Sequence, residues 1–266
     1  MAFWGNTFIF DDVACTEFGL MVYDFNSNSQ DDVEFQAGNV IEDRILRRYD
    51  SFMYGLDQNQ SLEYTLVFGA NMYALDNNKS LDRYEVEAIA SWLTGHQERK
   101  WLTIMQDDTE SYRYKCVISN LKLITYGSMP WAFSCRVTCD SPFAYTFPEE
   151  FEYTISGSTT INFFNRSTYN GYFRPKVEIT MSGGDVEIEN ISDKNRIFKF
   201  SDVPAGDTIT IFLDNQNQII TSDIGLNLYP YFNMNFMRLV RGDNILKITG
   251  DCTIRFICEF PVTIGG

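Results

Sequence analysis

Alternation of apolar and polar residues along short segments is the feature that most limits what this chain can fold into. Residues 252–260 are the clearest case, because every second residue from Cys252 to Phe260 is apolar and the residues between them are mostly polar. Residues 61–68 and 131–138 follow the same two-residue period. This period places successive side chains on opposite faces of a strand, with one face buried. The sequence therefore predicts a mainly β protein.

One segment departs from this pattern and predicts an α-helix at about residues 81–94. Ser80 is suited to the N-cap, because its hydroxyl can accept a hydrogen bond from an orphan backbone N–H, and Gly95 is suited to a left-handed C-terminal cap. The apolar positions repeat at helical spacing, at Val86, Ile89 and Leu93. The short apolar segment 101–105 follows directly and predicts a strand. A single amphipathic helix in a β-rich chain is expected to lie on a sheet.

The length of 266 residues allows one large domain or two domains of about 100–150 residues each. We predict a boundary at the Phe-Pro-Glu-Glu segment 147–150, which separates a β-rich N-terminal domain, residues 1–146, from a C-terminal domain, residues 147–266. The second half has short strands with turn signals about every ten residues, as a β-sandwich requires. We expect neither a signal peptide at the N-terminus nor a membrane-spanning helix, because no run of about 18 apolar residues occurs.

The formal net charge of −15 argues against tight nucleic-acid binding. Residues 1–145 carry 11 basic and 21 acidic residues, and residues 146–266 carry 10 basic and 15 acidic ones. Gripping phosphates requires clustered lysines and arginines, which neither half shows in its sequence. An acidic surface instead repels DNA over about 8 Å at physiological salt, and such repulsion would suit the wall of a passage.

Catalytic and metal-binding motifs are not predicted. The six cysteines are expected to be reduced thiols, and only Cys135 and Cys139 lie close together in the sequence. His96 is the single histidine, so it is the one imidazole that could serve as the base of a catalytic triad. A zinc site would lack ligands for the same reason. No phosphate-binding glycine loop precedes a helix. We therefore predict no catalytic residues, no cofactor and no metal.

Five short motifs in a fixed order resemble those of a known family. Arg83-Tyr84-Glu85 is followed by Ala90-Ser91-Trp92-Leu93, and Trp101-Leu102 and an acidic pair come next. An aromatic strand then ends in Cys-Asp-Ser-Pro-Phe-Ala-Tyr at residues 139–145, and a Gly-x-Asn turn at residues 242–244 precedes the last strand. This order is similar to that of the distal tail protein of long-tailed, siphovirus-type bacteriophages.

The resemblance implies a mainly β fold with a ring-forming N-terminal domain and a galectin-like C-terminal β-sandwich. It implies a non-enzymatic virion protein of the tail tip, made in the host bacterial cytoplasm. The partners would be five further copies in a hexameric ring, the tail tube protein, the tail hub or tail-associated protein, and a receptor-binding protein or fibre. DNA would pass through the ring without tight binding, and the protein would not insert into a membrane.

Two sets of site residues follow for such a ring. Some of a group of acidic residues are expected to face the lumen, namely Asp31, Asp32, Glu34, Asp107, Asp108 and Glu110. Arg47 and Arg48 are candidates for a contact with a neighbouring subunit, although exposed charge pairs contribute little to stability.

Two other functions are compatible with the sequence. A carbohydrate-binding module could stack sugar rings on Tyr229, Tyr231 and Phe232, although these aromatic residues would also suit core packing or a subunit contact. A tail-tip glycan hydrolase could use two of the many carboxylates, but it would need them about 5–10 Å apart across a cleft.

Overall fold

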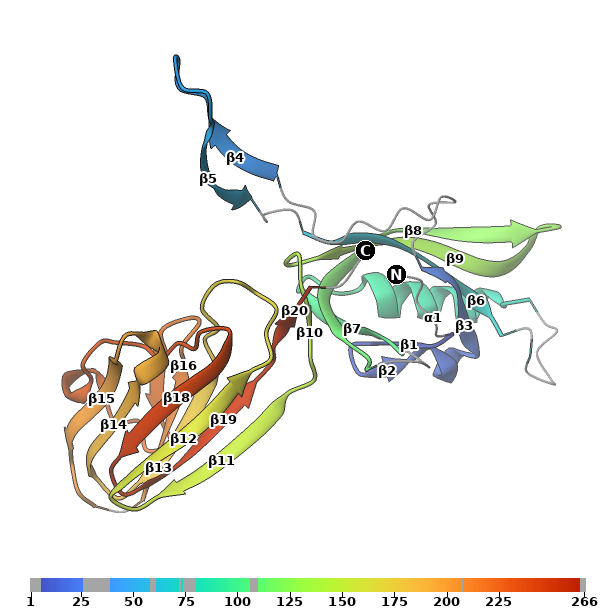
Figure 1. Ribbon diagram of the computed structural model, residues 1–266. Coiled ribbons are helices and arrows are strands. Elements are labelled where there is room, and N and C mark those ends of the chain that lie inside the picture. The colour runs from blue at the N-terminus through green and yellow to red at the C-terminus, as the bar shows by residue number, and fades with distance from the viewer. Residues whose placement is uncertain are drawn as a thin grey trace. The chain divides into compact units, whose positions relative to one another are not determined.

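The computed structural model describes residues 6–25, 39–57, 61–71, 73, 80–105, 110–206 and 208–263. The chain divides into two compact units, Met1–Tyr145 with Thr263–Gly266, and Thr146–Val262. Strands dominate both units, and the described residues contain one α-helix (Figure 1). The predicted mainly β fold with a single helix is confirmed.

The N-terminal unit is built on an antiparallel sheet in which seven strands follow the order β2-β1-β7-β8-β9-β6-β3. These strands are β1 (Phe8–Phe10), β2 (Val13–Ala14), β3 (Leu20–Phe25), β6 (Glu63–Ala70), β7 (Lys100–Ile104), β8 (Arg113–Tyr126) and β9 (Met129–Cys139). The two-residue strand β10 (Ala144–Tyr145) pairs with β8, and the 3₁₀-helix η1 (Cys15–Phe18) lies between β2 and β3. A separate two-stranded sheet consists of β4 (Asn39–Asp43) and β5 (Phe52–Asp57).

The helix α1 (Arg83–Thr94) begins two residues later than Ser80 would allow. Asp82 is the N-cap instead, because its carboxylate accepts from the Glu85 backbone N–H at 2.8 Å while the Glu85 carboxylate accepts from the Asp82 N–H at 2.7 Å. This reciprocal capping box satisfies two orphan donors, which a lone serine hydroxyl cannot do. The predicted left-handed cap at Gly95 is also wrong, since its φ is −72°. Glycine fits there because a Cβ would lie 2.5 Å from the Ser91 carbonyl oxygen.

The helix packs on the sheet through buried apolar residues, and Trp92 adds a hydrogen bond to this contact. Ile89 and Leu93 are fully buried, as the helical stripe predicted, and Trp92 lies beside them. The Trp92 indole stacks on Phe18 with ring centroids 4.9 Å apart, and its Nε1–H donates to the Phe10 carbonyl at 3.1 Å. Burial of the ring and satisfaction of its N–H therefore fix α1 against the first strand of the unit.

The C-terminal unit is a β-sandwich of two antiparallel sheets. One sheet has the order β11 (Glu149–Ile155), β19 (Cys252–Cys258), β13 (Lys176–Met181), β16 (Ile209–Asp214) and β17 (Ile219–Ser222). The other has the order β12 (Ser158–Asn165), β18 (Gly242–Thr249), β14 (Gly184–Asn190) and β15 (Arg196–Val203). The remaining short elements are the 3₁₀-helices η2 (Ile191–Asp193) and η3 (Tyr229–Tyr231) and the strand β20 (Pro261–Val262).

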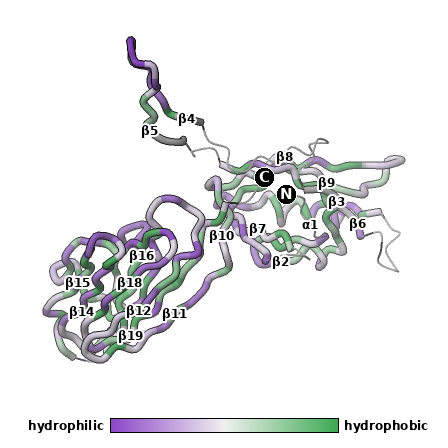
Figure 2. The backbone as a smooth tube through the Cα atoms, in the orientation of Figure 1, coloured by the Kyte–Doolittle hydropathy of each residue, from purple (hydrophilic) through white to green (hydrophobic). Residues whose placement is uncertain are grey.

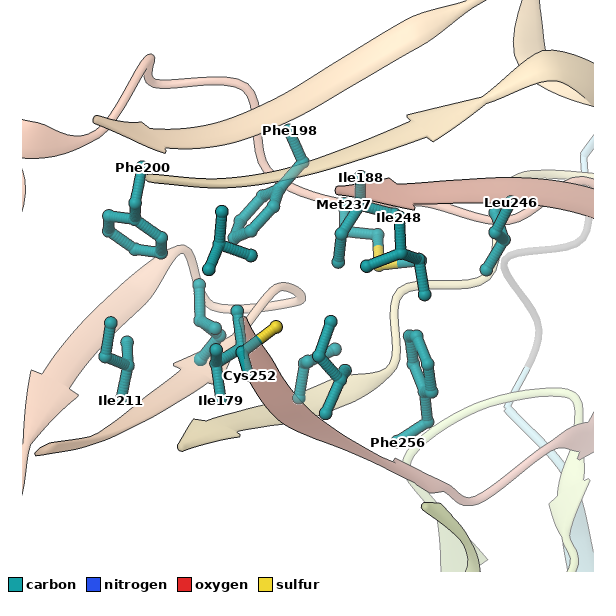
Figure 3. Packing of buried hydrophobic residues seen from close by; sticks show 14 of the residues in the cluster. Ile179, Ile188, Phe198, Phe200, Ile211, Met237, Leu246, Ile248, Cys252 and Phe256 are labelled. Atoms are coloured by element: carbon teal, nitrogen blue, oxygen red, sulfur yellow. The ribbon is translucent and has the colours of Figure 1, made fainter. Parts of the chain in front are cut away.

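The core of this sandwich is formed by the inward residues of both sheets. Ile188, Phe198 and Phe200 of one sheet point toward the layer that contains Ile179 and Ile211 of the other (Figure 3). Along the strands, hydrophobic and hydrophilic positions alternate in the same two-residue period (Figure 2). Strand β19 buries every second residue, so the alternation predicted for residues 252–258 is confirmed.

All six cysteines are buried free thiols. Burial raises the pKa of Cys135 and Cys139 to about 12 and that of Cys252 to about 11, from an ordinary value of 9.0. Burial also raises the pKa of the Cys116 and Cys258 thiols well above the usual range. Such thiols behave as small apolar groups and are poor nucleophiles.

We predict that the free energy of unfolding is constant from pH 7 to about pH 9 and falls above that. The folded state holds the thiol protons more tightly than the unfolded state, so the contribution is complete below the unfolded pKa and is lost as the pH rises toward 11–12. Each thiol that ionises only on unfolding contributes a slope of about 1.4 kcal/mol per pH unit. Urea unfolding at constant ionic strength between pH 7 and 11 measures this dependence of the free energy of unfolding on pH. A urea midpoint at pH 10.5 equal to that at pH 7 would contradict the prediction.

Candidate functional site

The β4–β5 hairpin forms a two-stranded sheet of its own. Its strands pair antiparallel from Asn39↔Asp57 to Asp43↔Phe52, with a bulge after Ile41. Near the tip, the Arg48 guanidinium forms an ion pair with Asp50 at 3.2 Å. The Ser51 hydroxyl donates to the Glu42 carboxylate at 2.6 Å. These polar contacts fix the turn between the strands.

The apolar side chains of this hairpin are exposed. Tyr49 and Leu46, at the tip, are 103% and 90% exposed, and the Phe52 and Tyr54 rings contact one another edge to face. The exposed large apolar residues of the hairpin are Ile41, Ile45, Leu46, Tyr49, Phe52, Met53 and Tyr54. An isolated two-stranded hairpin is marginally stable in water, and a contiguous exposed apolar surface usually marks an interaction site. We call residues 39–57 the apolar hairpin.

Arg47 and Arg48, the residues expected at a subunit contact, both lie at the tip of the apolar hairpin. Arg47 adopts a φ of 76°, in the left-handed region that reverses the chain, and Arg48 pairs with Asp50 inside the hairpin. The two arginines therefore lie within a surface dominated by apolar groups. Those apolar neighbours were not predicted from the sequence, because residues 44–54 show no two-residue alternation and only the Phe-Met-Tyr run 52–54 indicates a strand.

A second exposed apolar surface lies at the end of the β8–β9 hairpin. Gly127 and Ser128 have φ angles of 57° and 67°, which make the two-residue turn that matches the twist of the strands. Leu123, Ile124, Tyr126 and Met129 are exposed near this turn. Strand β8 runs unbroken from Arg113 to Tyr126, with a bulge between Ser119 and Lys122. The bulge lets one strand extend beyond the buried part of the sheet.

The candidate lumen residues are almost all outside the described residues. Asp31, Asp32, Glu34, Asp107 and Asp108 belong to segments that the structure does not describe, and Glu110 is exposed. Their location relative to a lumen therefore stays a prediction.

The three candidate sugar-stacking residues have very different environments. Phe232 is 6% exposed and packs against Phe198, Phe200 and Phe236 in the sandwich core, so no face of its ring is available to a sugar. Tyr231 is partly buried against the same core. Tyr229 is 41% exposed. The structure therefore does not bring these three rings together on one exposed surface.

A buried ion pair stabilises one end of the sandwich. The Asp193 side chain is 2% exposed and accepts from Nε and Nη2 of Arg238 at 2.6 and 3.1 Å. The Arg238 guanidinium also lies 3.7 Å from the centre of the Tyr172 ring. The hydrogen bond to Asp193 raises the pKa of Arg238. Neither residue stood out in the sequence, because they are 45 positions apart and only the fold brings them together.

Within the described part of the chain, no group of three or more His, Cys, Asp or Glu side chains is arranged to hold a metal ion. The helices described here are too short or too polar to cross a membrane. The candidate functional sites are thus surfaces, and two of them are apolar, on the β4–β5 and β8–β9 hairpins. The protein is mainly β, with two hairpins that expose apolar side chains.

Comparison with known proteins identifies the family. Residues 3–141 match a model described as a phage tail protein N-terminal domain, and residues 143–258 match a phage tail C-terminal domain. The chain therefore belongs to this family of phage tail proteins.

A curated relative and several solved structures are similar to the chain. The SPbeta prophage-derived uncharacterized protein YomH of Bacillus subtilis (strain 168) is 34% identical over 73 residues, which are 27% of this chain and 28% of that protein. The chain thus matches less than a third of the length of this relative.

The SPP1 Dit protein, described as a paradigm of the hub adsorption apparatus of phages that infect Gram-positive hosts, is 13% identical with a TM-score of 0.65, over 96% of this chain and 98% of that one. A chain of the activated phage P2 baseplate is 12% identical with a TM-score of 0.49, over 96% and 99%.

The similarity to SPP1 Dit shows a shared fold along nearly the whole chain. Together with the family assignment of both halves, it confirms the sequence-based recognition of a protein of the siphovirus distal tail type. The chain is a phage tail protein with the fold of SPP1 Dit.

We predict that Arg238→Ala lowers the free energy of unfolding by about 3 kcal/mol, because it leaves the buried Asp193 carboxylate without its partner. Asp193→Ala should cost less, since Arg238 is 28% exposed and can still be hydrated. The double variant should be less destabilised than the sum of the two single variants. Urea unfolding measures all three variants.

Arg83→Ala is the control, because the Arg83–Glu87 pair on α1 is 88% and 61% exposed. Such a pair contributes about 0.5 kcal/mol or less. Equal losses for Arg83→Ala and Arg238→Ala would contradict the structural role of the buried pair.

Proposed function

We propose that this protein forms a hexameric ring at the phage tail tip, which joins the tail tube to the baseplate and receptor-binding apparatus. The observation that supports this proposal best is the apolar hairpin. Its seven large apolar side chains are exposed, and its two strands form a sheet that nothing else in the described chain extends. A neighbouring subunit that covers this surface would remove the apolar groups from water at about 25 cal/mol per Å².

A ring requires one patch of each subunit to meet a different patch of the next, repeated until the rotation closes. The apolar hairpin supplies the first patch, and its unpaired strand edges can also hydrogen bond to a neighbour's strand. The number six is the one that the resemblance to distal tail proteins implies. The tail tube protein, the hub or tail-associated protein and a receptor-binding protein or fibre are the partners expected on the same ground. None of these roles requires a chemical reaction.

The acidic balance of the N-terminal half supports passage of DNA through the ring. Residues 1–145 contain 21 acidic and 11 basic residues, so a lumen lined by this half would repel the phosphates. The candidates for lumen-facing residues are Asp31, Asp32, Glu34, Asp107, Asp108 and Glu110.

We expect the purified chain to form hexamers, and Leu46→Ser with Tyr49→Ser to shift it toward monomers. These two substitutions remove the most exposed apolar groups of the hairpin tip without touching a core residue. Native mass spectrometry and light scattering measure the oligomer across a range of concentrations. The matched control combines Ile224→Ser with Tyr84→Ser, which are 65% and 82% exposed and lie outside the apolar hairpin.

A wild-type chain that stays monomeric at high concentration, both alone and with tail tube assemblies, would argue against the ring. If the control variant dissociates the oligomer as strongly as the hairpin variant, the hairpin is not the contact. An electron cryo-microscopy structure of the ring tests the lumen separately. All six acidic candidates on the outer rim would exclude the proposed lining.

A further inference from the structure

Strand β12 is an edge strand of the sandwich that lacks the usual protection against pairing with another chain. It pairs with β18 along all 8 of its residues without a bulge, and no strand that the structure describes pairs with its other edge. Its sequence, Ser-Thr-Thr-Ile-Asn-Phe-Phe-Asn, contains no charged residue and no proline. A long, regular and uncharged edge presents a row of backbone groups on which a further strand can add.

The other three edges of the sandwich are protected. Strand β11 carries three glutamates among its 7 residues, and β17 has only 4 residues. Strand β15 carries Arg196, Lys199 and Asp202, and its outer side is bridged to Phe232. Charges, short length and a covering segment are devices by which proteins block pairing at an edge. The open edge of β12 is therefore distinct from the other edges of the same unit.

The hydrogen-bond pattern with β18 determines which backbone groups of β12 point to the open edge. The Gly250 N–H donates to the Gly157 carbonyl at 2.8 Å, at the pair that precedes Ser158↔Thr249 in the register. Hydrogen-bonded and non-hydrogen-bonded pairs alternate along an antiparallel ladder, so every second residue after Gly157 bonds to β18. The residues between them direct their N–H and C=O groups to the open edge, namely Ser158, Thr160, Asn162 and Phe164.

The same side of the sandwich has apolar groups that the core covers only in part. Ile161 of β12 and Phe151 and Tyr153 of β11 pack against the core but are partly buried. The Phe151 and Phe163 rings meet edge to face with centroids 5.1 Å apart, so the edges of β11 and β12 lie on one side of the sandwich. The outward Phe164 is 59% exposed. A strand added to β12 would cover the partly buried groups with its inward side chains.

We propose that the open edge of β12 binds an extended segment of a different polypeptide, which adds to this sheet as a further strand. The segment alternates apolar and polar residues, because one of its faces covers Ile161 and the other lies in water. It is uncharged or basic, because Glu150 and Glu152 of β11 are exposed on the same side of the sandwich.

A second copy of this chain does not fit the open edge of β12 as well. Pairing of β12 with β12 would bring the glutamates of two β11 strands toward each other, in a chain of net charge −15. Like charges at such an edge are unfavourable. The inference concerns the C-terminal unit and does not depend on ring formation.

Hydrogen–deuterium exchange of the full chain, resolved to single residues by electron-transfer fragmentation, tests the pairing. The probe is the end-capped peptide Lys-Val-Thr-Val-Thr-Val-Thr-Val-Lys. We expect the amides of Ser158, Thr160, Asn162 and Phe164 to exchange about tenfold more slowly at about 90% occupancy, because only the free protein exchanges. The amides of the alternate residues change little, since β18 already protects them.

Thr160→Pro tests the backbone contact. The Thr160 N–H points to the open edge and not to β18, and proline is tolerated at such a position of an edge strand. We expect peptide binding, measured by fluorescence anisotropy, to weaken about tenfold, because one backbone hydrogen bond is lost. Thr160→Val is the matched control, because it keeps the N–H and should bind as the original chain does. If thermal unfolding shows that the proline variant is not folded, the exchange pattern of the original chain decides.

Slower exchange at the four alternate amides, with binding weakened in Thr160→Pro and unchanged in Thr160→Val, supports the proposal. A peptide with glutamate in place of both lysines should bind more weakly. The proposal is overturned if the lysine peptide slows none of the four amides, if it slows all amides of β12 equally, or if the glutamate peptide binds as tightly. Protection of the same amides that grows with protein concentration in the absence of peptide would assign the edge to a second copy, and this outcome also overturns the proposal.

Discussion

Burial of one face of each sheet is the constraint on which the rest of this structure depends. In the C-terminal unit the inward residues of two sheets form one continuous core, from Ile179 and Ile211 on one side to Ile188 and Phe200 on the other. In the N-terminal unit the inward residues face α1, which Trp92 attaches to the sheet. Because these cores are closed within each unit, apolar residues left outside them are available for contacts with other molecules.

The apolar hairpin is the clearest case of such residues. Its strands pair with each other, but residues 41–50 are exposed throughout, and Phe52, Met53 and Tyr54 are exposed as well. A protein that acts as a monomer would gain nothing from seven large apolar groups in water, and the exposed strand edges would add a risk of aggregation. The same surface is useful in an assembly, where it supplies binding energy without disturbing the folded units.

Buried polar groups have a different role in the sandwich. Asn190, Asn215 and Asn244 connect loops to strands through backbone groups that would otherwise be unpaired. Asp193 and Arg238 add an ion pair at the same end of the unit. These contacts define the positions of the irregular segments around residues 173 and 239.

Local patterning determined most of the secondary structure of this protein. The alternation in residues 252–258 and the stripe of Ile89 and Leu93 predicted elements that the structure contains, because side-chain period follows directly from backbone geometry. The order of the motifs was enough to recognise the family. The N-cap at Asp82 was missed because Ser80 also suits an N-cap. The reciprocal capping box of Asp82 and Glu85 satisfies more backbone donors than the single Ser80 hydroxyl could.

Only the tertiary structure decided which residues are exposed and which distant residues meet. Nothing in the sequence separates the buried Phe232 from an exposed stacking ring, because both are aromatic residues in a loop-rich segment. Likewise, Asp193 and Arg238 lie 45 positions apart in the printed sequence, and the fold brings them together as an ion pair. The physical reason is that the spacing of apolar residues in the sequence shows which face of a single strand is buried. Exposed surfaces and contacts between distant residues depend on how the strands pair and pack with one another.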